Sequence, residues 1–96
     1  MAIHISKAPV DAETAQMTAG VYLLFHVGDL FGAGTPRLTE EGHWELPIEF
    51  SNVRRGIIGQ VGTISVDAET GAVLFSDEEC EEVKARARLL AGASSP

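Results

Sequence analysis

The sequence predicts an α+β fold, in which an antiparallel sheet of three to four strands packs against an N-terminal helix and a C-terminal helix. Residues 43–50 alternate between apolar and polar side chains, as a strand with one buried face does. Residues 64–75 contain two apolar stretches separated by a turn sequence. Residues 76–91 start with acidic side chains and continue with apolar ones at helical spacing.

The strand at residues 43–50 has a clear inner face. Its inward side chains are Trp44, Leu46, Ile48 and Phe50, and Trp44 is expected to be a core residue. Pro47 lies on the opposite face and has no backbone N–H to donate. The strand is therefore expected at an edge of the sheet, or paired at Pro47 through the carbonyl alone.

The second strand pair is predicted from the turn at residues 67–71. Asp67 can accept hydrogen bonds within its own turn, and Gly71 can supply the positive φ that closes a hairpin with a bulge. The inward side chains of this hairpin are Ile64, Val66, Val73 and Phe75.

The aromatic strand at Trp44 followed by VDAETGAVL at residues 66–74 resembles PepSY-like domains. The resemblance implies a small α+β unit with a curved antiparallel sheet on helix, which binds or restrains other proteins instead of catalysing.

Residues 11–31 are predicted to form one helix. Asp11 is a candidate N-cap, and Ala15, Ala19, Leu23, Val27 and Leu30 have helical spacing. Residues 20–27 also have the composition of a buried strand, so that alternative stays open. On the helix, a second apolar stripe would contain Val21, Leu24, Phe25 and Phe31. One small sheet cannot bury both stripes, so the second predicts contact with another copy or with a partner protein.

The other elements follow from local signals. Gly32 to Thr35 should end the first helix, and a brief strand at residues 37–39 should form a hairpin with the strand that contains Trp44. Residues 51–62, which contain three glycines, are expected to cover a sheet edge or to lead into a strand near Ile58 or Gln60. Ser76 and Glu79 form a capping box for the last helix, and Gly92 should end it. The apolar stripe of this helix contains Cys80, Val83, Ala87 and Leu90.

Length and charge limit the function. The 96 residues predict a single domain over 1–96, with residues 1–10 as a loose arm or short edge strand and 93–96 as a frayed tail. The net charge of −7 disfavours binding to nucleic acid and favours a basic protein partner. We expect a cytoplasmic protein without membrane contact, because the sequence contains no signal peptide pattern or spanning segment and has one cysteine.

Few residues have the context of a reactive site. Arg54 and Arg55 are candidates for contact with an anion or a partner, although pairing with Glu45, Glu49 or the acidic helix is the commoner role of such residues. The histidines 4, 26 and 43 have no metal-ligand spacing, and the serines have no catalytic context. We therefore expect no metal, no cofactor and no enzymatic activity.

These features lead to one main hypothesis and two alternatives. The main hypothesis is a non-catalytic protein-interaction module that acts as a homodimer or with a partner that is larger or basic. One alternative is an antitoxin-like neutraliser of a basic toxin or nuclease. The other is an anion-binding or small-molecule-binding protein, or a small enzyme, with a pocket between helix and sheet that uses Arg54, Arg55 and His26.

Overall fold

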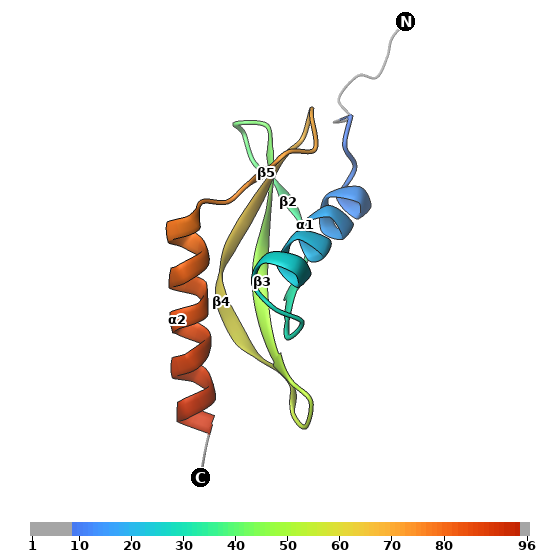
Figure 1. The fold of residues 1–96 in the computed structure, drawn as a ribbon. Coiled ribbons are helices and arrows are strands. Elements are labelled where there is room, and N and C mark those ends of the chain that lie inside the picture. The colour runs from blue at the N-terminus through green and yellow to red at the C-terminus, as the bar shows by residue number, and fades with distance from the viewer. Residues whose placement is uncertain (1–8, 95–96) are drawn as a thin grey trace, which may run out of the picture.

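The computed structural model describes residues 9–94, which form two helices and five strands (Figure 1). The helices are α1 (Ala12–His26) and α2 (Asp77–Ser94). The strands are β1 (Phe31–Ala33), β2 (Arg37–Leu38), β3 (His43–Asn52), β4 (Gly56–Asp67) and β5 (Val73–Leu74). The α+β prediction is confirmed, and the antiparallel sheet has one strand more than the upper number expected.

A long hairpin of β3 and β4 forms the centre of the sheet. Trp44 is paired with Val66 and Leu46 with Ile64, so the apolar sides of the two strands share one face. β5 pairs with β4 on one flank, and β1 and β2 pair with successive parts of β3 on the other flank. The short strand that was predicted at residues 37–39 is thus present as β2.

Of the two alternatives for residues 51–62, the one that leads into a strand is correct, but β4 begins at Gly56, earlier than expected. Ile48 pairs with Gly62 and Glu49 with Gln60, which leaves Val61 as an extra residue in β4. Such a bulge shifts the side-chain alternation by one position. Val61 is buried on the helix side of the sheet although its position in the sequence breaks the alternation. Strict alternation of apolar and polar residues therefore does not reveal this part of β4 in the sequence.

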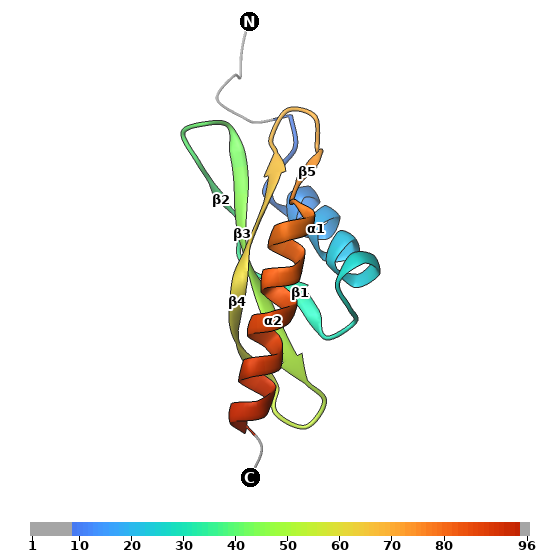
Figure 2. The same ribbon diagram turned by 60° about the vertical axis from the view of Figure 1, so that its left-hand side comes forward.

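Both helices contribute to one core on the same face of the sheet, and Figure 2 shows α2 in front of the sheet with α1 to its right. α1 contacts β1, β3, β4 and β5, whereas α2 contacts β4. One core cluster joins them, made of Ala15, Ala19, Leu23, Leu46, Ile48, Phe50, Val61, Ile64, Val66, Val83 and Ala87. The predicted inner face of β3 is confirmed, and so are Val83, Ala87 and Leu90 on α2, because these residues are buried or pack against the cluster. Cys80 is half-buried and lies outside the cluster.

Pro47 lies in a central strand and not at an edge. The Pro47 carbonyl accepts a hydrogen bond from the Gly34 N–H at 2.8 Å. In an antiparallel ladder the N–H and C=O of one residue point to the same neighbour. The nitrogen of Pro47 therefore faces the segment between β1 and β2, and the alternative of pairing through its carbonyl alone is correct.

α1 is shorter than the predicted helix of residues 11–31. The Asp11 carboxylate accepts from the Thr14 N–H at 2.8 Å, as expected of the N-cap. The helix ends at His26, and the N–H of Gly28 donates to the Leu23 carbonyl. Phe31 then starts β1, where the centroid of its ring lies 5.2 Å from the centroid of the Phe50 ring. The prediction that Phe31 shares a helix face with Val21 is wrong, because the chain leaves the helix before reaching it.

The two ends of the described chain also differ from expectation in part. Ser76 and Glu79 form the predicted capping box, but α2 continues past Gly92 to Ser94. Residues 1–8 of the predicted arm and residues 95–96 of the predicted tail lie outside the described residues. The Val10 N–H donates to the Ala68 carbonyl, which attaches the start of the described chain to the turn after β4.

Candidate protein-interaction surface

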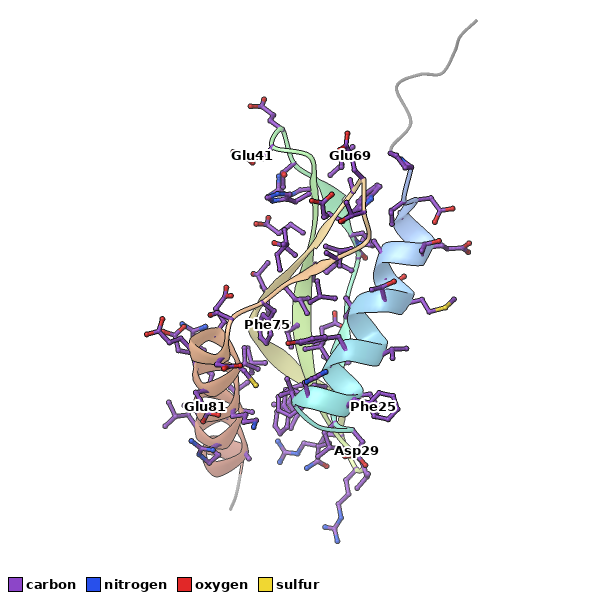
Figure 3. All side chains as sticks on the ribbon, turned by 45° about the horizontal axis from the view of Figure 1, so that its top comes forward. Phe25, Asp29, Glu41, Glu69, Phe75 and Glu81 are labelled. Carbon is purple, nitrogen blue, oxygen red and sulfur yellow. The ribbon has the colours of Figure 1, made fainter. Side chains whose placement is uncertain are left out.

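The solvent side of α1 carries a row of apolar side chains that the protein does not cover. The exposed fractions are 69% for Met17, 50% for Val21, 46% for Leu24 and 77% for Phe25. We call these four residues the outer stripe. Figure 3 shows Phe25 on the side of α1 that faces away from the sheet.

The outer stripe follows from the helical period of the sequence. Ala15, Ala19 and Leu23 recur every four residues and are fully buried, so they fix which side of α1 meets the sheet. The members of the outer stripe lie on the opposite side of α1, because they are rotated about the helix axis by roughly half a turn from these three buried residues. Three of its members were predicted from the sequence. Met17 was missed, although it lies four residues before Val21.

The C-terminal end of α1 is joined to the start of α2 by aromatic contacts. The Tyr22 ring stacks on His26 with centroids 4.1 Å apart and meets the edge of Phe75 at 6.0 Å. The Cys80 thiol lies 3.7 Å from the His26 carbonyl. His26 thus contacts an aromatic neighbour on its own helix, and neither of the hollows described below includes it.

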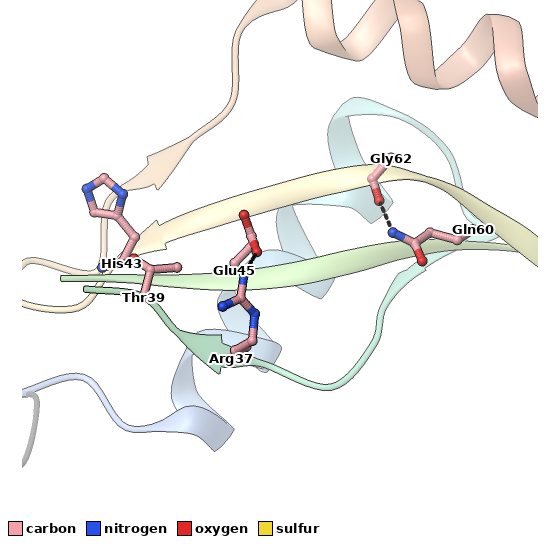
Figure 4. Close-up of polar contacts among 6 residues, drawn as sticks. All are labelled: Arg37, Thr39, His43, Glu45, Gln60 and Gly62. Carbon is pink, nitrogen blue, oxygen red and sulfur yellow. Dashed lines mark hydrogen bonds and ion pairs between the residues drawn. The ribbon is translucent and has the colours of Figure 1, made fainter. Parts of the chain in front are cut away.

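Arg54 and Arg55 are exposed in the turn between β3 and β4. The Arg54 N–H donates to the Asn52 side chain at 2.8 Å, which holds the turn. Glu45, one of the carboxylates considered as a partner for these arginines, instead forms an ion pair with Arg37 (Figure 4). The two arginines stand together at one tip of the molecule, and their role in contact with an anion or partner stays a prediction.

The sheet face opposite the helices is polar. Glu45 pairs across the strands with Ser65, Pro47 with Thr63, and His43 with Asp67. Gln60 donates through its side chain to the Gly62 carbonyl (Figure 4). At the end of this face, a hollow of about 500 Å³ is lined by Arg37, Leu38, Thr39, Glu40, Glu41 and Glu45.

Asp67 stabilises the turn between β4 and β5. Its carboxylate accepts from the N–H groups of Glu69 at 2.8 Å and Thr70 at 3.1 Å. These bonds favour the ionised form and lower the pKa of Asp67, and the nearby charge of His43 acts in the same direction. Gly71 has a φ of 79°, so the predicted turn chemistry is confirmed at both residues.

A second hollow lies between β4 and the C-terminal half of α2. It has a volume of about 370 Å³ and is lined by Gln60, Arg86, Leu89 and Leu90. This feature was missed from the sequence, because Leu89 falls outside the inner stripe of α2.

Within residues 9–94, no group of three or more His, Cys, Asp or Glu side chains is arranged to hold a metal ion. Neither α1 nor α2 combines the length and apolar character that crossing a membrane requires.

Comparison of the chain with protein-family models, with curated proteins and with solved structures gave no match in any of the three. The resemblance to PepSY-like domains therefore stays a prediction that rests on the strand with Trp44 and the turn at residues 66–74.

Proposed function

We propose that this chain is a non-catalytic protein-interaction module that pairs with a second copy of itself through the outer stripe of α1. The observation that carries the proposal is the exposure of Met17, Val21, Leu24 and Phe25 along one helix face. Removing a large apolar side chain fully from water is worth about 1.5–3 kcal/mol. A contact that covers all four would therefore provide a substantial driving force for association.

The charge distribution favours a second copy over a basic partner at this surface. Two chains that each carry −7 repel one another least when they meet at a surface without carboxylates. Residues 14–25 contain no charged side chain, so the outer stripe provides such a place. A basic partner would find no counter-charge there and would be drawn to the acidic surfaces instead.

A twofold contact suits the spacing of the outer stripe. In a symmetric pair each residue contacts its counterpart or a partner equally distant from the axis. If two antiparallel copies of α1 cross at Val21, Met17 of one copy faces Phe25 of the other. Thioether sulfur against an aromatic ring is a favourable contact. The protein-binding role implied by the PepSY-like resemblance agrees with such a module.

The proposal is tested by the mass of the protein in solution. We expect the wild-type chain to sediment as a dimer of the 10.2 kDa chain and Leu24→Lys as a monomer. The matched control is Leu38→Lys on β2, because Leu24 and Leu38 are 46% and 45% exposed. The control should remain dimeric. A wild-type protein that is monomeric at every concentration tested, or equal behaviour of the two variants, would contradict pairing through α1.

A further inference from the structure

Positive charge is concentrated at one end of this acidic molecule. Residues 50–66 and 83–94 hold five of the seven Lys and Arg residues and none of the 14 Asp and Glu residues. Figures 1 and 2 both place the β3–β4 turn beside the C-terminal half of α2. Lys84 is paired with Glu81 at 3.8 Å, and the other four of these five residues are arginines. We call this region the basic end and define it by Arg54, Arg55, Arg86 and Arg88.

Few carboxylates reach the basic end from other elements. Asp29 and Glu49 are near it along the backbone, because the Leu30 carbonyl accepts from the Ser51 N–H and Glu49 pairs with Gln60 across the hairpin. Even with Glu82, which lies four residues before Arg86 on α2, these carboxylates are fewer than the four arginines. The basic end therefore keeps a positive potential on a protein whose total charge is −7.

The same end exposes apolar side chains between the arginines. The exposed fractions are 91% for Val53, 64% for Ile57 and 73% for Leu89. Leu89 and the half-buried Leu90 also line the hollow of about 370 Å³ beside β4. Its volume lies in the range of pockets that accept ligand groups, about 300–1,000 Å³. A partner that covers this end can therefore insert an apolar group there.

Arg86 is positioned at the wall of this hollow. Its guanidinium donates through one Nη atom to the Val61 carbonyl at 3.3 Å, across from α2 to β4. A guanidinium has five N–H donors, so one such bond orients the group and leaves donors for a carboxylate. An apolar hollow with a fixed arginine at its wall suits a chain segment that combines an apolar side chain with acidic neighbours.

We propose that the basic end binds an acidic peptide segment of a partner protein, with a leucine-like or aromatic side chain in the hollow and its carboxylates on Arg54, Arg86 and Arg88. Two other anionic occupants fit these observations less well. A DNA or RNA strand meets repulsion from the rest of the chain, and residues 51–66 and 83–94 offer it no aromatic side chain for base stacking. A flat anionic membrane could contact Val53 and Ile57 but would leave the hollow unfilled.

The experiment uses the full chain and a phage-displayed library of random dodecapeptides as the probe. We expect selected peptides to combine several Asp or Glu residues with a Leu, Ile or Phe. Affinity of a selected synthetic peptide should fall by about tenfold or more in the double variant Arg54→Gln with Arg88→Gln, and should decrease with salt. Leu89→Ser should weaken binding as well, because it removes part of the apolar wall.

Matched controls separate this site from other surfaces. Arg37→Gln makes the same charge change on β2 and should leave peptide affinity unchanged. Leu24→Lys should also leave it unchanged, so a failure of pairing through α1 and a failure of peptide binding can be told apart. Enrichment of basic or uncharged peptides, or of none, would overturn the proposal. The proposal would also be overturned if the arginine double variant kept its affinity for the peptide but lost binding to phosphatidylserine vesicles, to a DNA duplex or to a second copy of the chain.

Discussion

The side-chain amide of Gln16 supplies the hydrogen bond that Pro47 cannot give to the sheet. The Gly34 N–H donates to the Pro47 carbonyl, so Pro47 would be the ladder donor to the Gly34 carbonyl if it had an N–H. Gln16 donates to that carbonyl at 3.0 Å and to the adjacent Ala33 carbonyl at 3.1 Å. A residue of α1 thus completes the sheet at the point where proline interrupts it.

This relationship predicts a coupling between Gln16 and Pro47. Gln16→Ala should lower the free energy of unfolding by about 1 kcal/mol, because the two carbonyls lose their side-chain donor. Pro47→Val restores a backbone N–H opposite Gly34, so Gln16→Ala should cost less in that background. A double-mutant cycle by urea denaturation measures the difference. Additive effects of the two substitutions would mean that Gln16 does not replace the missing ladder bond.

A second prediction concerns Gly71 in the β4–β5 turn. Its φ of 79° is a conformation that branched side chains adopt at a cost of about 1–3 kcal/mol. We expect Gly71→Val to lower the free energy of unfolding by more than about 1 kcal/mol. The control is Gly32→Val in β1, where φ is ordinary and an added Cβ would have no neighbouring atom within 4 Å. Equal costs at the two sites would show that positive φ does not decide the outcome.

A third prediction is a pH dependence that belongs to Asp67. Because the pKa of Asp67 is lowered in the folded state, its ionised form adds stability above the unfolded pKa of about 3.9, and this is lost as the pH falls through the folded pKa. Asp67→Asn removes the charge but keeps an acceptor oxygen. The melting temperature of the wild type should exceed that of the variant at neutral pH, and the gap should close in acid. A constant gap would show that the charge is not responsible.

The sequence predicted those parts of the fold that depend on local chemistry. The Asp11 cap, the Ser76–Glu79 box, the Asp67 turn and the alternation of β3 each need only neighbouring residues, and all four are present. The errors arose where distant contacts decide the structure. Phe31 fits the helical spacing but pairs with Phe50, nineteen positions further along the chain. Val61 breaks the strand alternation because of a bulge, which pairing with β3 defines.

The candidate surfaces were predictable to a similar degree. Val21, Leu24 and Phe25 could be placed on the solvent side from helical spacing, since Ala15, Ala19 and Leu23 form the better inner stripe. The basic end could not be found in this way. Arg54 and Arg88 are far apart in the sequence, and only the length of the β3–β4 hairpin brings the turn alongside the end of α2.

A final prediction tests how closely α2 packs on the central hairpin. A Cβ at Gly62 would lie 2.8 Å from a methyl carbon of Val83, which is closer than carbon atoms approach without a shift. Gly62→Ala should therefore cost about 1–3 kcal/mol by overpacking. Val83→Ala removes the obstructing methyl groups, so the two substitutions together should cost less than the sum of their separate effects.

The control for this experiment is Gly32→Ala, which adds the same methyl group to a strand where no atom lies within 4 Å. It should change the free energy of unfolding by less than about 0.5 kcal/mol. Denaturation with urea gives all of these values on one scale. If Gly62→Ala were as mild as Gly32→Ala, α2 would pack less closely against β4 than the distance to Val83 indicates.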